Sequence, residues 1–198
     1  MKLGLYGGTF DPVHHAHLIL ARQAVEQLGL DRLVFIPAAQ SPFKPQVQAA
    51  PAEHRLQMIE LAIQGEERFG VDGLEVGRKG PSYTFDTVEI YRRRQPASEL
   101  YWLVGEDHVP ALNRWHRFAE LVTQVQFVIL ARAESVAETP YPVIRRRVDI
   151  SATEIRNRVA NDLPITYLVP EEVRRYLQAV KLYQGDEHRS PGASPALR

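Results

Sequence analysis

Short apolar runs alternate with longer amphipathic segments along the chain. The four clearest apolar runs are Lys2–Tyr6, Arg32–Pro37, Leu100–Val104 and Gln126–Leu130. Because these runs do not alternate between apolar and polar residues, they predict strands that are buried on both faces. Weaker runs over 69–76 and 143–150 predict two further strands. Apolar residues at helical spacing predict helices over 17–28, 53–63, 84–93, 152–159 and 170–180, with a short helical piece within 111–122.

Strands that alternate with helices predict an α/β fold class, here a Rossmann-like doubly wound parallel sheet with helices on both faces. Ligands of such sheets bind beyond the carboxyl ends of the strands, near the switch in strand order. Neither a repeat nor a linker interrupts the pattern, which favours a single domain over residues 1–184. Residues 185–198 are rich in Gly, Ser, Pro and charge, which predicts a flexible C-terminal tail.

Composition narrows the possible function classes. The chain has 24 Lys and Arg against 24 Asp and Glu, and this balance favours neither a nucleic-acid nor a membrane partner. No stretch approaches the roughly 18 apolar residues of a membrane-spanning helix. The absence of cysteine excludes disulfides, thiolate metal sites and thiol catalysis. Since the N-terminus also lacks the pattern of a signal peptide, we expect a cytoplasmic protein.

The segment after the first predicted strand has the features of a phosphate-binding turn. Gly7 and Gly8 allow a ligand to approach the backbone closely. Asp11 is a favourable N-cap and Pro12 is a favourable first helical residue. A helix that begins there would direct free N–H groups and a positive dipole end at an anion.

Two histidines in this segment are candidate phosphate ligands. His14 and His17 are three residues apart, so they would lie about one turn apart on one helix face. The same pattern also fits a tight turn followed by two surface histidines. A zinc site made of His14, His15 and His17 is a further alternative, although no His-Glu-x-x-His pattern accompanies them.

A second candidate anion site lies near the C-terminal end, in the segment from Ile150 to Arg156. Ser151 is a plausible N-cap for a helix whose residues Ile155 and Val159 face inward. Arg156 could contact an anion held at that helix N-terminus. The alternative is an ordinary capped helix with a solvated arginine.

Both segments resemble known signatures. Residues 7–18 (Gly-Gly-Thr-Phe-Asp-Pro-Val-His-x-x-His-Leu) resemble the motif of bacterial nicotinate-nucleotide adenylyltransferases, in the nucleotidyltransferase superfamily with the His-x-Gly-His motif. Ala16 stands where that family has Gly. Residues 150–156 resemble the second signature of the family, Ile-Ser-Ser-Thr-x-Ile-Arg, with Ala152 replacing the second Ser. Two signatures in the right order are far more specific than either alone.

Smaller matches support this resemblance as far as about residue 180. Residues 41–44 (Ser-Pro-Phe-Lys) resemble a Pro-Pro-His-Lys loop and keep Lys44. Residues 80–87, with Tyr83 and Thr84, resemble the segment that lines the nicotinate pocket. Residues 105–107, followed by Trp115, resemble a Gly-x-Asp…Trp stretch. Taken alone, these residues also fit a solvated lysine, a helix cap beside a core aromatic residue, and a core tryptophan.

The resemblance implies a nucleotidyltransferase-type fold that transfers AMP from ATP to nicotinate mononucleotide, forming nicotinate adenine dinucleotide and pyrophosphate in NAD biosynthesis. It implies that His14 and His17 are catalytic. The residues implied in ATP binding are Gly7, Gly8, Thr9, Phe10, His14, His17, Asp107, Ile150, Ser151, Thr153 and Arg156. The residues implied in binding the mononucleotide are Lys44, Tyr83, Thr84 and Trp115. We expect Mg²⁺ to be carried with ATP and not held in a carboxylate cage of the protein.

Several other functions remain open from the sequence. A sister adenylyltransferase could use pantetheine phosphate, and a close relative could use nicotinamide mononucleotide. A fragment of a class I aminoacyl-tRNA synthetase shares a His-x-x-His motif but would need a Lys-Met-Ser-Lys-Ser segment that this chain lacks. A non-catalytic nucleotide sensor is favoured only by Ala16 and Ala152. The sequence also leaves a homo-oligomer possible.

Overall fold

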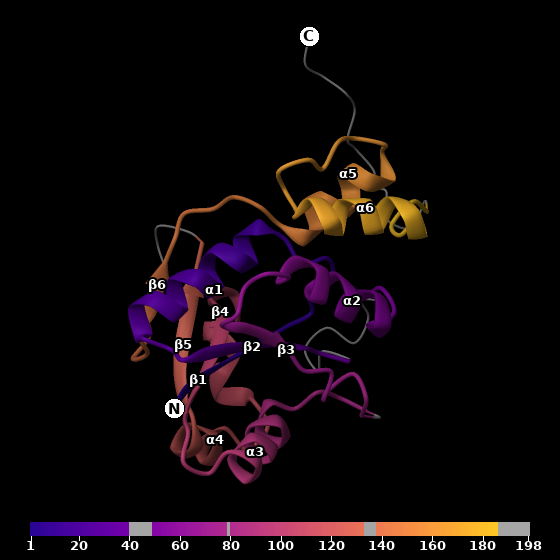
Figure 1. The fold of residues 1–198 in the computed structure, drawn as a ribbon. Coiled ribbons are helices and arrows are strands. Elements are labelled where there is room, and N and C mark those ends of the chain that lie inside the picture. Colours follow the sequence, from indigo (N-terminus) through magenta and orange to yellow (C-terminus); the bar gives the residue numbers. More distant parts are fainter. Residues whose placement is uncertain (40–48, 79, 133–137, 186–198) are drawn as a thin grey trace.

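The computed structural model describes residues 1–39, 49–78, 80–132 and 138–185 (Figure 1). Its centre is a six-stranded, entirely parallel sheet with the strand order β3-β2-β1-β4-β5-β6. The strands are β1 Lys2–Gly8, β2 Arg32–Pro37, β3 Phe69–Val71, β4 Glu99–Gly105, β5 Gln126–Ala131 and β6 Val143–Arg145. The predicted parallel α/β sheet is therefore confirmed.

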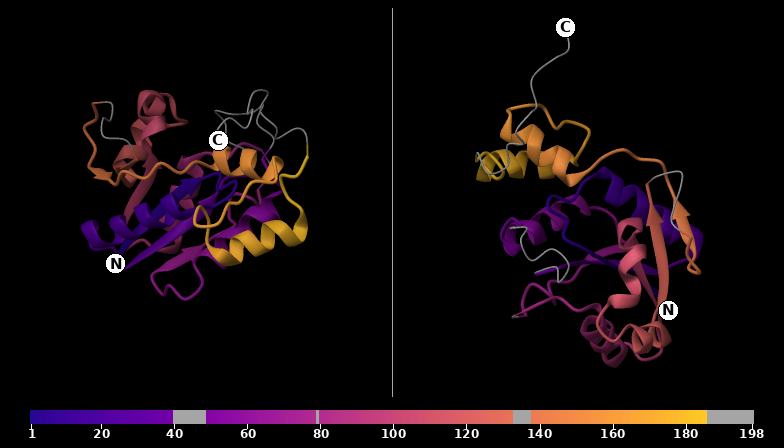
Figure 2. Two further views of the ribbon diagram at one scale, coloured as in Figure 1. Left: turned by 90° about the horizontal axis from the view of Figure 1, so that it is seen from above. Right: turned by 180° about the vertical axis from the view of Figure 1, so that it is seen from behind.

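Helices cover both faces of the sheet. They are α1 His15–Leu28, α2 Ala52–Ala62, α3 Thr84–Arg94, the 3₁₀ helix η1 Glu106–Arg114, α4 Phe118–Gln124, α5 Ala152–Ala160 and α6 Glu171–Val180. Figures 1 and 2 show α1 and α2 on one side of the sheet and α3 and α4 on the other. The helices α5 and α6 form a further layer beyond α1 and α2.

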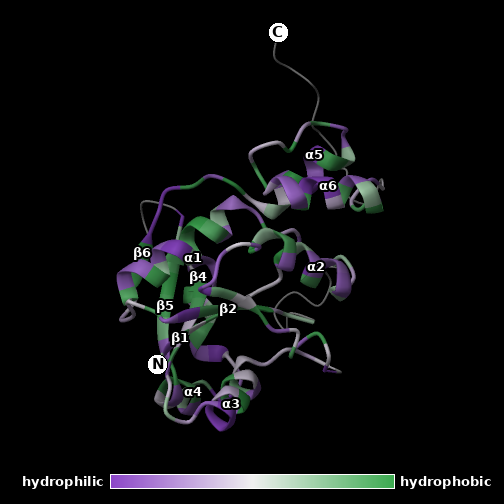
Figure 3. Cartoon of the chain, in the orientation of Figure 1, coloured by the Kyte–Doolittle hydropathy of each residue, from purple (hydrophilic) through white to green (hydrophobic). Residues whose placement is uncertain are grey.

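Successive strand residues supply two separate cores. Tyr6 and Phe35 pack into the core under α1 and α2, whereas Leu5 and Val34 pack into the core over α3. Because side chains alternate across a strand, a continuous apolar run serves both layers. Burial of one such large side chain contributes about 1.5–3 kcal/mol. Figure 3 shows the neighbouring strands β4 and β5 as apolar.

The C-terminal helices belong to the core on the α1 side. Val173 and Leu177 of α6 pack in the same cluster as Leu20 of α1 and Met58 of α2. The boundary at residue 184 stays a prediction, and most of the predicted tail (186–198) lies outside the described residues. Within the part that the structure describes, no helix is long and apolar enough to cross a membrane.

Three predicted elements differ from the structure. The strand predicted over 69–76 ends at Val71, because the next residue, Asp72, turns the chain by accepting the Leu74 N–H at 2.9 Å. The strand predicted over 143–150 ends at Arg145. The helical piece predicted within 111–122 is interrupted, since Trp115 has an extended backbone between η1 and α4.

The predicted helix start at Asp11 and Pro12 is wrong. The helix α1 begins at His15, with His14 as its N-cap. The Asp11 carboxylate is unavailable for capping, because it is buried and accepts hydrogen bonds from the Ala50 N–H and the Tyr183 hydroxyl. The N–H of His15 donates to the Leu168 carbonyl at 3.1 Å. That group of the helix N-terminus is therefore already bonded and does not face a ligand.

Candidate active site

The candidate active site lies at the switch in strand order, where the sequence predicts a ligand. The chain runs from β1 outward through β2 to β3, and β4 then returns to the other side of β1. The carboxyl ends of β1 and β4 therefore flank the switch. They carry Gly7 and Gly8 at the end of β1 and Gly105 at the end of β4.

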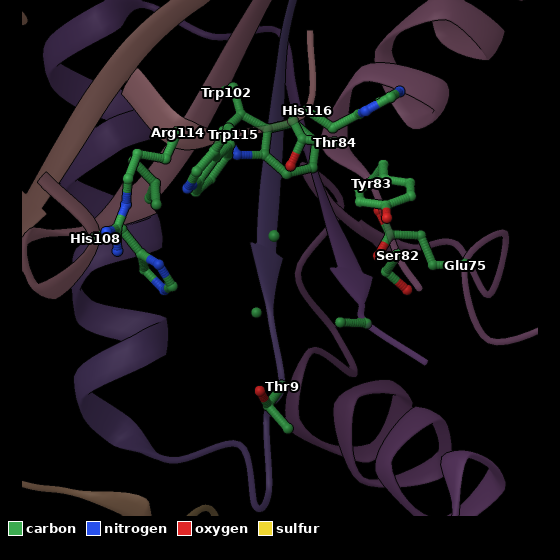
Figure 4. Close-up of a pocket in the computed structure, with 14 residues that line it drawn as sticks. Thr9, Glu75, Ser82, Tyr83, Thr84, Trp102, His108, Arg114, Trp115 and His116 are labelled. Atoms are coloured by element: carbon green, nitrogen blue, oxygen red, sulfur yellow. The ribbon is translucent and has the colours of Figure 1, made fainter. Parts of the chain in front are cut away.

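A pocket of about 360 Å³ opens at this point, and Figure 4 shows the side chains around it. It is lined by Gly7, Gly8, Thr9, Ala38, Glu75, Ser82, Tyr83, Thr84, Trp102, Val104, His108, Arg114, Trp115 and His116. In Figure 4, Trp102 and Trp115 lie at one end of the pocket and Thr9 lies at the other. The structure therefore gathers the predicted glycine turn, Tyr83, Thr84 and Trp115 around one cavity.

The glycine at position 7 is required by a close approach. A Cβ atom on Gly7 would lie 2.4 Å from Cζ2 of Trp102, whose ring is almost fully buried. The indole therefore lies directly on the backbone of β1, and any side chain at residue 7 would displace it. Bulk at this position would change the shape of the pocket floor.

His14 and His17 form a stacked pair beside this turn. Their ring centroids are 3.7 Å apart, with an angle of 24° between the ring planes. Nδ1 of His17 accepts the backbone N–H of His14 at 3.2 Å. The neutral His17 ring must then carry its proton on Nε2, because Nδ1 is occupied as an acceptor. Nε2–H is the group that His17 can offer to a phosphate oxygen.

The surroundings of both histidines disfavour the protonated form. Burial is the main reason that the pKa of His14 falls to about 3, with smaller contributions from the charges of Arg132 and His15. Burial also lowers the pKa of His17 well below its usual value, helped by His14 and Arg132. A bound polyphosphate would oppose this shift, because a nearby anion favours the protonated imidazole.

Asp11 joins the N-terminal and C-terminal turns. Its backbone carbonyl accepts a hydrogen bond from Nη1 of Arg156 at 2.7 Å. Its carboxylate lies 3.7 Å from the same nitrogen. Ser151 caps α5 by accepting the Glu154 N–H at 3.1 Å, as predicted. The hydroxyl of Thr153 accepts a hydrogen bond from Nη2 of Arg156 at 3.4 Å. The two signature segments therefore lie together in the fold.

A fully buried arginine, Arg55, donates hydrogen bonds to the backbone of the glycine turn and its neighbours. The guanidinium of Arg55 donates to the carbonyls of Thr9 at 2.9 Å, Ala38 at 2.7 Å and Ala50 at 2.9 Å. Ala38 and Ala50 flank the segment 40–48. Arg55 thus ties the turn at the end of β1 to both ends of that segment. Lys44 belongs to it and lies outside the described residues.

The opposite wall of the pocket is the start of α3. Tyr83 is the N-cap and Thr84 is the first helical residue, and the Tyr83 side chain makes no capping hydrogen bond. The ring of Tyr83 packs against that of His116, with centroids 4.5 Å apart. The adjacent Ser82 hydroxyl accepts the Ala39 N–H at 2.9 Å. Uncapped N–H groups at this wall can bind an anionic group such as a carboxylate.

Of the predicted ATP ligands, all of which the structure describes, Gly7, Gly8 and Thr9 line the pocket and the others lie outside its lining. The ring of Phe10 is buried in the core against Tyr6, His17 and Phe35, which leaves only its backbone for a ligand. Asp107 does not line the pocket, and its carboxylate lies 3.8 Å from Nε2 of His108. The charge of Asp107 nevertheless reaches Tyr6, where it adds to burial in raising the pKa of that phenol.

The sequence interpretation missed Arg132, which follows β5 directly. Its Nη1 donates to the carbonyl of Ile150 at 2.9 Å, and its charge lowers the pKa of both His14 and His17. It therefore adds a positive charge between the histidine pair and the C-terminal turn. A cation directly after a buried strand, at the same edge as the glycine turn, was the signal that could have identified it.

Other pocket residues were also missed. Glu75 is buried, and burial raises its pKa, while hydrogen bonds from Thr87 and Ser82 act in the opposite direction. His108, Arg114 and His116 bring basic groups to the pocket. Their spacing matches no simple periodicity, because they lie on η1 and on the irregular segment after it.

Comparison with known proteins agrees with this geometry. A family model described as cytidylyltransferase-like matches residues 5–158. A probable nicotinate-nucleotide adenylyltransferase of Methylacidiphilum infernorum is 42% identical over 188 residues, covering 92% of each chain. The nicotinate-nucleotide adenylyltransferase of Bacillus subtilis is 38% identical, covering 92% of this chain and 98% of that protein.

The fold also matches solved structures. Nicotinic acid mononucleotide adenylyltransferase of Plasmodium falciparum, complexed with NaAD, superposes with a TM-score of 0.79 and covers 92% of this chain and 97% of that one. At 18% identity this likeness concerns the fold alone. The extent and identity of the sequence matches show that the chain belongs to the nicotinate-nucleotide adenylyltransferase family of cytidylyltransferase-like proteins.

Proposed function

We propose that this chain transfers AMP from ATP to nicotinate mononucleotide, giving nicotinate adenine dinucleotide and pyrophosphate. The observation that carries the proposal is the junction of the two signature turns, where Nη1 of Arg156 donates to the Asp11 carbonyl at 2.7 Å. The N-terminal turn also supplies Gly7, Gly8 and Thr9 to the lining of the pocket. A triphosphate at the junction and a mononucleotide in the pocket would meet at the turn formed by residues 7–9. Bringing two anions together in line is the main task of such a reaction.

The mononucleotide supplies the nucleophile. An oxygen of its phosphate bonds to the α-phosphorus of ATP, and the bond from that phosphorus to the bridging oxygen breaks as pyrophosphate leaves. The attacking phosphate is already anionic near neutral pH, so the reaction requires no protein base. His17 would donate its Nε2–H to an α-phosphate oxygen, where charge develops in the transition state. His14, stacked on it at 3.7 Å, would hold the ring in place.

The remaining residues would bind and orient. Arg156, Ser151 and Thr153 would hold the outer phosphates at the N-terminus of α5, and Arg132 would add a further cation. On the acceptor side, the start of α3 at Tyr83 and Thr84 would receive the pyridine carboxylate, and Trp115 would stack on the ring. We infer that Mg²⁺ enters as the ATP complex, in which it screens the phosphates.

A pyrophosphate-release assay tests the proposal. We expect release with MgATP and nicotinate mononucleotide together, and much less with nicotinamide mononucleotide, because an amide offers the α3 N-terminus a dipole in place of a charge. Binding of ATP without release from either mononucleotide would show a nucleotide sensor instead. Chelation of Mg²⁺ should stop turnover. The cytoplasmic location, the homo-oligomer and the absence of a nucleic-acid partner stay predictions.

A further inference from the structure

Tyr183 lies beyond the last helix, yet its side chain reaches the N-terminal turn. Lys181 and Tyr183 have left-handed backbone conformations, with φ of 53° and 64°, which turn the chain back at the end of α6. The Tyr183 ring is buried in the core on the α1 side. Its hydroxyl donates to Oδ1 of Asp11 at 2.6 Å, across 172 positions of sequence.

The Asp11 carboxylate needs such a donor. It is 5% exposed, and a buried carboxylate is costly unless hydrogen bonds and charges compensate for the lost water. Oδ1 receives the Ala50 N–H at 3.1 Å in addition to the Tyr183 hydroxyl. Nη1 of Arg156 lies 3.7 Å from Oδ2. Of the hydrogen bonds formed by described residues to this carboxylate, that from Tyr183 is the shorter and the more deeply buried.

Asp11 in turn positions Arg156. One guanidinium nitrogen of Arg156 is fixed by the Asp11 carbonyl at 2.7 Å, and the other contacts Thr153 at 3.4 Å. A change in the orientation of Asp11 would therefore move the anchor of Arg156, the side chain that the proposed function assigns to the triphosphate. Burial and the Asp11 charge both raise the pKa of Tyr183, so its hydroxyl keeps its proton and remains a donor at working pH.

We propose that Tyr183 is a positioning residue for ATP. By holding the Asp11 carboxylate, it fixes the Arg156 guanidinium beside the N-terminal turn, and it does so from outside both signature segments. The inference rests on the proposed function for the role of Arg156 toward the triphosphate. It predicts that loss of one hydroxyl, far along the chain from either turn, weakens the site for ATP more than the site for the mononucleotide.

The test compares Tyr183→Phe with two controls. Tyr183→Phe keeps the buried ring and removes the hydroxyl that donates to Asp11. Val173→Ala makes a cavity in the same core from α6, and it supplies a loss of stability without touching the Asp11 hydrogen bonds. Tyr167→Phe removes a hydroxyl from a side chain that is 87% exposed. Urea unfolding of all variants gives the stability against which the kinetics are compared.

We expect Tyr183→Phe to raise KM for ATP and the Kd of ATP by about 5- to 10-fold, the change produced by losing one hydrogen bond from an ordered site. KM for nicotinate mononucleotide should change less than about twofold, and both controls should match the wild type in both constants. Equal changes in both substrates, an unchanged KM for ATP, or the same pattern in Val173→Ala would overturn the inference.

The binding measurement separates this inference from the proposed function. Calorimetric titration with MgATP, in the absence of any acceptor, reports the Kd without turnover. If the wild type binds ATP but releases no pyrophosphate, the proposed function fails, and the comparison of Kd between Tyr183→Phe and Val173→Ala still decides the role of Tyr183.

Discussion

Acidification should expose the energetic cost of burying His14. His14 is 1% exposed, and burial lowers its pKa from 6.5 to about 3. Between these two values the unfolded chain binds a proton that the folded protein excludes, so the free energy of unfolding falls as the pH falls from about 6.5 toward 3. For this group alone, linkage puts the loss between pH 7.5 and pH 5.0 at about 2 kcal/mol.

Urea unfolding at the two pH values measures this loss. We expect His14→Phe, which keeps a stacked ring and cannot titrate, to lose about 2 kcal/mol less than the wild type over the same interval. Absolute stability will also differ between the two proteins, so only the change with pH is compared. Parallel losses in both proteins, or an NMR titration in which the His14 ring protonates near its ordinary pKa, would refute the reasoning.

Three further predictions concern the reaction itself. His17→Ala should lower kcat by about 100-fold, with a far smaller change in the Kd of ATP, because its contact matters most in the transition state; an unchanged kcat in steady-state assays would contradict this role. Arg132→Ala should raise KM for ATP about tenfold through loss of a charge-assisted hydrogen bond, measured at fixed mononucleotide; equal effects on both substrates would argue against it. Gly7→Ala should displace Trp102, because the new Cβ would lie 2.4 Å from Cζ2. It should therefore reduce kcat/KM for the mononucleotide and lower Tm, and a variant with wild-type values would show that the floor of the pocket adapts.

Much of the fold was predictable because its signals are local. A parallel strand covered on both faces must be apolar on both faces, so runs such as residues 126–130 identify strands by themselves. Strand order then places the ends of β1 and β4 together, and the glycine turn with them. The meeting of this turn with the segment from Ile150 to Arg156 follows from the resemblance, and the hydrogen bond between Asp11 and Arg156 confirms it.

The failures have a common physical cause. Asp11 before a proline has the local chemistry of a helix cap, but its carboxylate is taken by Tyr183, whose position no local pattern reveals. Arg55 on α2 was not singled out from the sequence, since a charged helix residue usually faces solvent. It is buried, and four backbone carbonyls, of Thr9, Ala38, Ala39 and Ala50, accept hydrogen bonds from its guanidinium. Buried polar groups of this kind depend on long-range partners, which periodicity and propensity do not encode.

The hydrogen bond from Tyr183 to Asp11 also sets an order of events during biosynthesis. A ribosome releases the chain N-terminus first, so a nascent polypeptide emerged through residue 160 already holds every strand that the structure describes, together with both signature turns. It still lacks the phenol that secures Asp11. The strands can thus form first, while the hydrogen bond that secures Asp11 forms only once residue 183 has been added, and cleavage between α6 and Tyr183 should weaken ATP binding more than it weakens the packing of α6 on the core.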